Sequence, residues 1–599
     1  MRKRYAALLY AALAVVVTWP LVLHLGEAVP GWLGDQGYNC WAIDTFWTQL
    51  TSGHSPVGTT FRIFVPFGYR LTDTDQAPLV ALAAGPFWAW GGEHGLIAFF
   101  GIAVLLAPVA GGFGIRATAL ALGVDAWAAS WAGLLYAASP TVVAFLGSPW
   151  HFKVIGGALF PWALAALCRW HAVPTGRRLA VLSAAAWALA LVNGYVAVMF
   201  VVVALAVGVL ALRRALVPTI AVGLLVNIAF VVAIGTVALQ SDFGDFSCCG
   251  FWGLAHADLR DVFIPGEQTG VWTTPAGPRV AGSGLRWNGP FGFLSRYKAD
   301  TGEDPGSYYL GFGAMGLMLV GCWRRRRDRR VLGLMLGGVL LVLMAGGSVL
   351  QWGGVPVVTD PCWLPWMWAM RVPWLRVLDL PRCFMLGANA ALLAVPAAGL
   401  GALRWRRSAS AALVLAIVVL EYGHVGINLT TLDVPEAIRA VQTLPGFRTL
   451  LELPRGIVES KGGFGLGSTN SIGDYWQTVH RKPTVAAYVS RVPFSTFSRF
   501  FYEPVLGDLL VYTNPGHGFT NPGDHVRRDL PVLPSYDAAT VGQFVRRLNL
   551  GAVLVGTDGA PAEVQDLNAT VQRLLAGYIA TIQRWPDGYT LYVLTDVSH

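Results

Sequence analysis

The sequence predicts an α-helical protein that crosses a membrane many times and ends in a soluble α/β domain. Hydrophobic residues make up 55% of the 599 residues and charged residues only 13%, which is about half the charge of an average soluble domain. Long apolar runs alternate with short arginine clusters, as in membrane proteins whose cytoplasmic loops are positively charged. Residues 429–599 lack such long runs and alternate short apolar segments with Gly/Pro turns.

The basic composition does not indicate a nucleic-acid partner. The formal net charge is +9, but the arginines are grouped between apolar runs, as in the cytoplasmic loops of membrane proteins. The 24 Trp and 18 Tyr residues suit the two membrane interfaces, where an aromatic side chain has one apolar and one polar neighbourhood. We therefore expect membrane lipid as a partner, and no nucleic acid.

Apolar length and arginine placement predict the spans. A spanning helix needs about 20 mostly apolar residues, and short basic loops stay in the cytoplasm. The strongest orientation marker is Arg324–Arg330, which we place inside. The sequence thus predicts about eleven spans, with a cytoplasmic N-terminus and an outer C-terminus. The predicted spans are 5–25, 96–114, 127–146, 152–167, 179–192, 196–212, 217–239, 308–323, 331–350, 384–403 and 409–426.

Long outer loops and a tail complete the predicted organisation. The transmembrane domain, residues 1–428, has long outer loops at 26–95, 240–307 and 351–383. Residues 429–599 follow on the same side as an extracytoplasmic domain, long enough to hold its own core. In this tail, alternation and turn residues predict the secondary structure. The strands are 447–453, 484–489, 550–556 and 589–594, and the helices are 433–441 and 538–548.

The first outer loop has an acidic residue close to the membrane. Asp35 follows Gly34 shortly after the first span, just before the tryptophan-containing segment 36–50. A carboxylate at this place is within reach of the outer membrane face, where it can act as a general base. The same residue also suits the N-cap of a helix that begins near Gly37. One carboxylate can serve both roles.

Other carboxylates of this loop rank behind Asp35. Asp73 and Asp75 lie further along the loop and are candidates for a second catalytic carboxylate. A turn, or a cap before the next helix, explains these two residues more simply. Asp44 falls on the amphipathic helix, and we expect it on the solvated face of that helix.

Short motifs occur in the outer loops, near the span ends and in the tail. They are Gly34-Asp35; Gly133–Pro140 followed by Trp150-His151; Asn193-Gly194-Tyr195; Tyr309-Leu310-Gly311; Leu375–Phe384; His480–Pro483; and Tyr488–Arg491. Together with the architecture, these motifs resemble bacterial members of the GT-C superfamily of membrane glycosyltransferases over essentially the whole chain. The Trp-Trp-Asp-Tyr-Gly signature of the oligosaccharyltransferase branch is absent, which argues against transfer of a glycan to asparagine.

The resemblance implies an enzyme of cell-envelope glycan biosynthesis. It would move a hexose or pentose from a polyprenyl-phosphate-linked donor to a hydroxyl of a glycan, lipid or protein acceptor, at the outer face of the inner (plasma) membrane. An inverting displacement of this kind requires a general base for the acceptor proton and cations for the leaving phosphate. By resemblance and position, Asp35 fits the general base.

Four outer residues are candidates for binding the donor phosphate. Arg376 and Arg382 flank a Leu-Asp-Leu-Pro turn at the mouth of a span, and a guanidinium suits bidentate contact with phosphate. Arg260 and His151 are placed on the same side by the predicted topology. Contact with lipid headgroups or with neighbouring acidic side chains is the alternative for the arginines, and an interfacial structural role is the alternative for His151.

The tail supplies candidates for acceptor binding. His480 and Arg491 can bind polar groups of a glycan, and the ring of Tyr488 can stack on a sugar. A purely structural role is the alternative for each. The seven cysteines show no metal-binding spacing, so no cofactor is required. A divalent metal would fit if Asp35 and a second carboxylate converge.

A transporter or flippase of lipid-linked glycans is the main alternative function. Transporters tend to have repeated halves and ionisable residues in mid-span. Here the predicted spans are nearly free of charge, and the polar residues gather in the outer loops. An assembly scaffold and an O-antigen ligase or polymerase are further alternatives. The pattern favours chemistry at the membrane surface.

Overall fold

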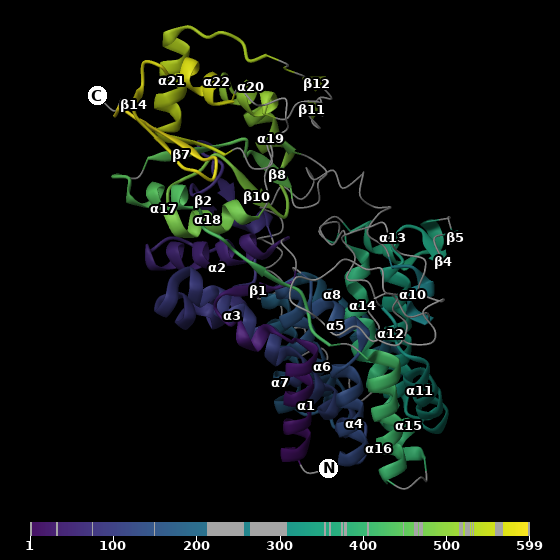
Figure 1. The fold of residues 1–599 in the computed structure, drawn as a ribbon. Helices are drawn as coiled ribbons and strands as arrows, with labels where there is room; N and C mark the ends of the chain where they lie inside the picture. The colour runs from purple at the N-terminus through teal and green to yellow at the C-terminus, as the bar shows by residue number, and fades with distance from the viewer. Residues whose placement is uncertain are drawn as a thin grey trace.

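The computed structural model places a bundle of helices at one end of the molecule and the tail at the other (Figure 1). The N-terminus lies at the bundle end and the C-terminus in the tail. The structure describes residues 3–31, 34–74, 76–148, 150–211, 257–263, 308–352, 355–358, 361–372, 375, 380–403, 407–423, 425–446, 448–459, 465–466, 471–513, 519–520, 527–528, 530, 532–556 and 567–596.

The bundle forms from the predicted apolar runs. Its helices are α1 (Lys3–Val17), α3 (Pro78–Ala121), α4 (Ala126–Ala137), α5 (Pro140–Leu146), α6 (His151–Ala172), α7 (Gly176–Val192), α8 (Gly194–Ala211), α11 (Phe312–Arg324), α12 (Arg329–Ala345), α14 (Phe384–Leu393), α15 (Pro396–Ala402) and α16 (Arg407–Ala416). The predicted span 217–239 lies outside the described residues.

Among the described residues, three helical segments are long and apolar enough to cross a membrane: Pro78–Ala121, His151–Ala172 and Pro381–Ala402. The pair α4 and α5, bent by 48°, would make a fourth. Shorter apolar helices, such as Phe312–Arg324, accompany them. The total of about eleven spans stays a prediction.

The arginine cluster after α11 binds the end of another helix. Arg330 donates to the carbonyl oxygen of Ala121 at 3.0 Å, and Arg325 donates to that of Leu122 at 3.1 Å. The last carbonyl groups of a helix have no partner within the helix, so cations are favourable there. The two arginines therefore bind the free carbonyl groups at the C-terminal end of α3.

The tail contains a four-stranded sheet. Its strands, in spatial order, are β14 (Ile579–Arg584), β15 (Thr590–Leu594), β13 (Leu550–Val555) and β7 (Thr449–Leu453). Strand β13 is parallel to β7 and antiparallel to β15. Strands β7, β13 and β15 coincide with predicted strands, whereas β14 was not predicted. Its residues are mostly exposed. The strand therefore lacks the alternation of apolar and polar residues by which a half-buried strand is recognised in a sequence.

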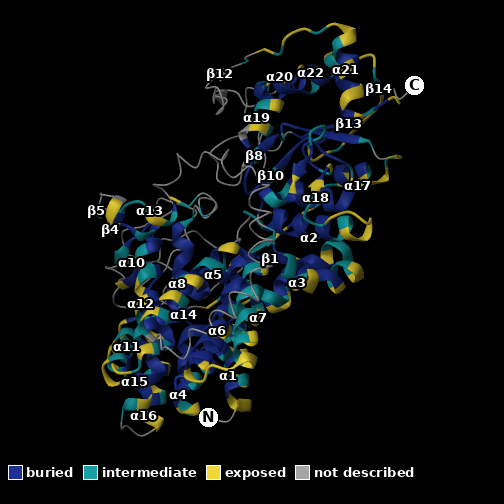
Figure 2. Ribbon diagram, turned by 180° about the vertical axis from the view of Figure 1, so that it is seen from behind, coloured by how far each residue is buried: buried dark blue, intermediate teal, exposed yellow. Residues whose placement is uncertain are grey.

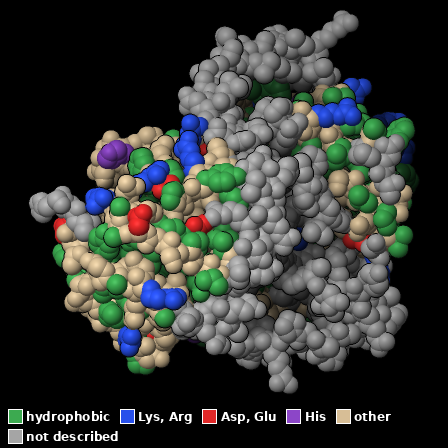
Figure 3. Space-filling model, turned by 90° about the horizontal axis from the view of Figure 1, so that it is seen from above, with side chains coloured by type: hydrophobic (Ala, Val, Ile, Leu, Met, Phe, Trp, Pro, Cys, Tyr) green, Lys and Arg blue, Asp and Glu red, His purple; other side chains and the backbone are tan. Residues whose placement is uncertain are grey.

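A second sheet and six helices complete the tail. The sheet order is β10 (Ala487–Val489), β8 (Ile457–Glu459) and β9 (Gly465–Leu466). The helices are α17 (Glu436–Thr443), α18 (Ile472–His480), α19 (Phe494–Phe501), α20 (Leu506–Tyr512), α21 (Ala538–Leu548) and α22 (Leu567–Leu574). Seen from above, basic, acidic and apolar side chains are interspersed on the described surface (Figure 3).

The shorter elements lie in the outer loops, at the junction with the tail and, for the last two, within the tail itself. They are β1 (Ala28–Pro30), α2 (Gln36–Thr51), β2 (Thr59–Thr60), β3 (Tyr69–Arg70), α10 (Leu259–Phe263), β4 (Leu350–Trp352), β5 (Val355–Val358), α13 (Pro365–Ala369), β6 (Leu429–Thr431), β11 (Phe519–Thr520) and β12 (Arg527–Arg528). Short 3₁₀ turns include Leu71–Asp73 and Pro381–Cys383.

Buried apolar side chains form two clusters, one in the bundle and one in the outer part (Figure 2). The outer cluster contains Trp41 of α2, Phe64 of the first outer loop and Val553 of β13, all fully buried. The first outer loop therefore shares a core with the tail. The predicted domain boundary after residue 428 stays a prediction.

Backbone pairing and one close helix contact attach the tail to the first outer loop. Strand β1 pairs antiparallel with β6, which joins Val29 to Thr430. Helices α2 and α18 meet where α18 begins. A Cβ atom on Gly37 would lie 1.7 Å from the carbonyl oxygen of Ser471. Glycine is thus required at this position of α2.

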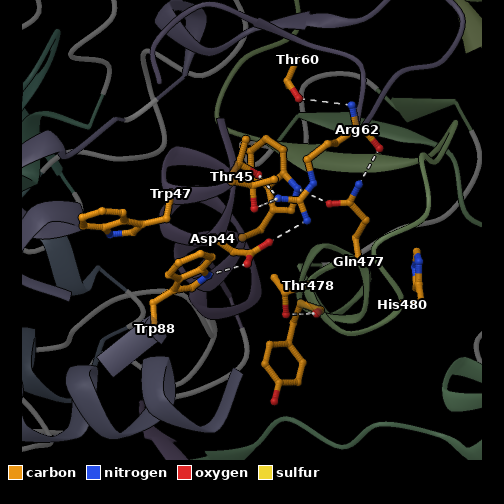
Figure 4. Close-up of polar contacts among 12 residues, drawn as sticks. Asp44, Thr45, Trp47, Thr60, Arg62, Trp88, Gln477, Thr478 and His480 are labelled. Carbon is orange, nitrogen blue, oxygen red and sulfur yellow. Dashed lines mark hydrogen bonds and ion pairs between the residues drawn. The ribbon is translucent and has the colours of Figure 1, made fainter. Parts of the chain in front are cut away.

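An ion pair stabilises the same junction (Figure 4). Asp44 of α2 contacts Arg62 at 2.6 Å, with side chains 4% and 11% exposed. Asp44 also accepts a hydrogen bond from Trp88 Nε1 at 2.8 Å. The carbonyl oxygen of Arg62 accepts from Gln477 Nε2 of α18 at 2.6 Å, and Gln477 Oε1 accepts from Trp41 Nε1 at 2.6 Å. Arg62 thus links α2 to the tail.

The prediction that Asp44 lies on a solvated face is wrong. The residue is 3% exposed because the loop around Arg62 covers the polar side of α2. The sequence of α2 alone does not show that another segment packs on this side. A carboxylate buried there needs the guanidinium and the indole as partners.

We expect Asp44→Asn to destabilise the protein by about 3–5 kcal/mol, because Arg62 would keep a buried charge without a partner. Asparagine preserves the acceptor for Trp88 and the side-chain volume. The measurement is thermal unfolding of the purified full chain. In the double variant with Arg62→Met, the loss should be smaller than the sum of the two single losses. Additive losses would contradict a coupled pair.

Gly37→Ala should lower stability by about 1–3 kcal/mol, the usual effect of overpacking a tight contact. It should also increase proteolytic cleavage between the bundle and the tail. Gly577→Ala is the matched control, since a Cβ atom there meets nothing within 4 Å. Equal melting temperatures for both variants would show that α2 and α18 can separate without cost.

Candidate active site

The first outer loop folds against the start of α2 and of α6. The carbonyl oxygen of Pro30 accepts from Gln36 Nε2 at 2.8 Å and lies 3.0 Å from His151 Nε2. Gly31 has φ +89°, and a Cβ atom there would collide with the backbone of the turn before α6. The loop that carries Asp35 is therefore held between these two helices.

Asp35 occupies the N-cap position of α2 without capping the helix. Its side chain makes no capping hydrogen bond, and the N–H of Gly37 donates instead to Ser471 Oγ of the tail at 3.3 Å. The Tyr488 hydroxyl of β10 donates to Asp35 Oδ1 at 3.1 Å. The geometry therefore speaks against capping as the sole role of Asp35. Its carboxylate faces the tail.

Two carboxyl groups and one arginine of the tail lie near Tyr488. Asp474 Oδ1 accepts from the backbone N–H of Tyr488 at 3.1 Å. Asp474 and Glu452 are each 3% exposed, and burial raises the pKa of both carboxyl groups, an effect opposed by Arg455. The Arg455 guanidinium lies over the Trp476 ring, 4.0 Å from its centroid. Both carboxyl groups are thus biased toward the uncharged form.

Asp73 lies at the same end of α2 as Asp35. The hydroxyl groups of Tyr38, in the first turn of α2, and of Thr74 are 2.6 Å apart. This contact brings the turn that contains Asp73 against the helix, and Asp73 is 2% exposed. The structure therefore brings one of the two secondary carboxylate candidates to the Asp35 end of α2.

Two buried cations face one tryptophan at the start of α6. Lys153 and Arg382 are 5% and 8% exposed. The ammonium of Lys153 lies 5.0 Å from the Trp150 ring centroid and 5.2 Å from that of Tyr195. The Arg382 guanidinium lies 5.0 Å from the same Trp150 ring. His151, next to Trp150, is fully buried. This part of the structure concentrates positive charge beside the first outer loop.

The remaining predicted phosphate and carboxylate candidates are not described at this site. The backbone N–H of Arg260 donates to Asp258 Oδ1 at 2.8 Å at the start of the short helix α10. Arg376 and Asp75 lie outside the described residues.

The three predicted acceptor-binding residues differ in exposure. His480 and Arg491 are 2% and 5% exposed, whereas Tyr488 is partly exposed. Burial, reinforced by nearby cations, lowers the pKa of His480 to about 3, and His480 Nδ1 accepts from the N–H of Lys482 at 3.0 Å. His480 is therefore a neutral, internal residue at physiological pH. The Tyr488 hydroxyl contacts the Asp35 carboxylate.

Sequence reasoning missed Lys153, Ser471 and Asp474. A signal existed for Lys153, because a charge at the start of an apolar span is expensive and usually functional. No local pattern marks Ser471 or Asp474. Their positions depend on how the tail packs against α2, which is a contact between distant parts of the chain.

Within the described ranges, no group of three or more His, Cys, Asp or Glu side chains converges. Asp35 and Asp73 are two carboxylates at one end of α2, and whether they hold a divalent metal stays a prediction.

One solved structure of an arabinofuranosyltransferase resembles this fold. The arabinofuranosyltransferase AftD from mycobacteria has a TM-score of 0.52 and 13% identity over 100% of this chain and 40% of AftD. The chain thus spans less than half the length of AftD. This likeness concerns the fold alone.

Two further structures are less similar. The oligosaccharyltransferase of Archaeoglobus fulgidus has a TM-score of 0.48 and 13% identity, covering 99% of this chain and 74% of its own. ArnT from Cupriavidus metallidurans has a TM-score of 0.44 and 12% identity, covering 99% and 98%.

Comparison of sequences gives a family. No curated protein matches the chain. The family described as "Domain of unknown function (DUF6311)" matches residues 7–421. Because this match spans more than half of the 599 residues, the chain belongs to the DUF6311 family.

Proposed function

We propose that the chain transfers a sugar from a polyprenyl-phosphate-linked donor to an acceptor hydroxyl at the outer face of the plasma membrane. The acceptor oxygen attacks the anomeric carbon, the bond from that carbon to the phosphate oxygen breaks, and polyprenyl phosphate leaves. The acceptor proton passes to Asp35, the general base. Attack opposite the leaving group inverts the anomeric configuration. The likeness of the fold to AftD supports this reaction class.

The single observation that carries the proposal is the environment of Asp35. A carboxylate with only a capping role would accept hydrogen bonds from the first amides of α2. Here Ser471 of the tail serves one of these amides, and Asp35 is partly exposed. A partly exposed carboxylate beside a membrane span, held in place by a second domain, suits proton abstraction from a bound acceptor.

Lys153 and Arg382 suit the leaving phosphate. Negative charge develops on the phosphate as the bond to the sugar breaks, and cations in a low-dielectric site stabilise this charge more strongly than in water. Both cations lie on the Trp150 ring beside the loop of Asp35. Arg376, Arg260 and His151, the other predicted phosphate ligands, remain candidates.

Transport of a lipid-linked glycan is the alternative function. A flippase would need a passage through the bundle, with polar residues along it. The buried cations at the start of α6 would then belong to the entrance of such a passage. Transfer and flipping are therefore measured in the same membranes, with fluorescent donor lipid for the second assay.

Asp35→Asn should reduce transfer by about 10²–10⁴-fold, the usual contribution of a general base. The assay is transfer of labelled sugar from a panel of polyprenyl-phosphate donors in membranes that contain the full chain. Asp537→Asn is the matched control, because Asp537 is a true N-cap in the tail that accepts from the N–H of Thr540.

Three outcomes of this assay are distinct. Wild-type transfer that disappears in Asp35→Asn supports the enzyme and its base. Equal transfer in both removes Asp35 from the mechanism and directs attention to Asp73. Lipid flipping without transfer from any donor contradicts the proposal and supports transport.

Lys153→Met and Arg382→Gln should each lower kcat by about 10²-fold, because each removes one positive group at the leaving phosphate. Arg382→Lys should lose less, since the charge remains while the planar fork is lost. Arg178→Gln is the control, because Arg178 is a partly exposed arginine on α7 that donates to the carbonyl oxygen of Arg169. Unchanged kcat in the first two variants would place the phosphate elsewhere.

A further inference from the structure

The tail provides a tyrosine that contacts the carboxylate at the start of α2. The Tyr488 hydroxyl and Asp35 Oδ1 are 3.1 Å apart, although 453 positions separate the two residues. We propose that Tyr488 is a positioning residue whose hydroxyl holds one oxygen of Asp35 and so orients the carboxylate toward the acceptor. This inference rests on the proposed function, in which Asp35 is the base.

The backbone of Tyr488 is fixed by two neighbours. Strand β10 runs parallel to β8, and Tyr488 is paired with Val458. The N–H of Tyr488 donates to Asp474 Oδ1 at 3.1 Å, and Asp474 itself is 3% exposed. Asp474 on α18 therefore fixes the backbone of Tyr488, and the phenol side chain extends from this backbone to Asp35.

Asp35 is fixed from the other side by the same helix of the tail. The residue before α18, Ser471, accepts from the N–H of Gly37 and lies too close to it for any side chain at position 37. The tail thus makes two contacts at the start of α2. Ser471 contacts Gly37, and Tyr488 contacts Asp35. The close contact between α2 and α18 therefore keeps Asp35 and Tyr488 in a fixed relative position.

A hydrogen bond from a phenol to a carboxylate has two consequences. It limits rotation of the carboxylate, and catalytic groups must be held to within about 0.5 Å of the productive geometry. It also stabilises the ionised form, which is the form that accepts a proton. Loss of this bond should therefore lower kcat and move the acid limb of the rate profile to higher pH.

Other titratable and charged groups surround this pair. From the tail, Asp474 and Glu452 face it together with Arg455, and burial raises the pKa of both carboxyl groups. From α6, His151 contacts the loop of Asp35 through the Pro30 carbonyl. None of these residues is changed in the variant that tests the proposal, so a shift of the acid limb reports the lost hydroxyl.

The test is a pH profile of transfer by Tyr488→Phe in the full chain. Phenylalanine keeps the ring and removes only the hydroxyl. We expect kcat to fall about tenfold and the acid limb to move up by about one pH unit, the shift equivalent to one charge-assisted hydrogen bond of modest strength. The KM for the acceptor should change little.

Tyr536→Phe is the matched control. Tyr536 also donates its hydroxyl to a carboxylate of the tail, that of Asp508, so the two variants lose the same kind of bond. Only Tyr488→Phe should change the profile. Asp474→Asn, which keeps an acceptor for the N–H of Tyr488, should retain the wild-type acid limb, whereas Asp474→Leu should resemble Tyr488→Phe.

The failure of this inference and the failure of the proposed function give different results. Wild-type transfer by Asp35→Asn would remove the base itself. If Asp35→Asn is inactive while Tyr488→Phe has the wild-type kcat and profile, Tyr488 does not position the base. A higher acceptor KM with an unchanged acid limb would also overturn the inference, because Tyr488 would then contact the acceptor instead.

Discussion

The contact between α2 and α18 is the constraint on which the outer part of the structure depends. Position 37 has no room for a Cβ atom because the carbonyl group of Ser471 occupies that space. The close approach lets Ser471 accept the hydrogen bond that an N-cap residue of α2 would normally take. Asp35 therefore does not cap the helix, and its carboxylate accepts a hydrogen bond from Tyr488 instead. A steric requirement at one glycine thus decides the chemical surroundings of a carboxylate.

Buried polar groups make this arrangement specific. The pair of Asp44 and Arg62 contributes less to stability than its short distance suggests, because both groups lose their hydration. The geometry of this pair nevertheless restricts how the tail can dock on the first outer loop. Arg62 must reach Asp44 with its guanidinium while its carbonyl group accepts from Gln477 and from the N–H of Thr484. A tail docked in another register would leave these groups without partners, and that penalty is large in a dry interface.

The sequence predicted the elements that depend on local pattern. Apolar runs gave the helices of the bundle, and alternation gave β7, β13 and β15. Position relative to the first span identified Asp35, since the membrane fixes the depth of a nearby residue. Local pattern failed for Asp44, whose helix face looks solvated until the Arg62 loop covers it. It failed also for Ser471 and Asp474, which are ordinary polar residues of a helix start. The role of Ser471 comes from a contact across 434 positions, whereas Asp474 contacts Tyr488 within the tail.

The distance along the chain between Asp35 and its partners has a consequence for biosynthesis. The first outer loop emerges from the ribosome long before Ser471 and Tyr488 are translated. A nascent chain at this stage carries the carboxylate of Asp35 with neither partner, and the start of α2 lacks its hydrogen bond to Ser471. Under the proposed function, the base and its positioning residue come together only after the tail has been synthesised and has folded against α2.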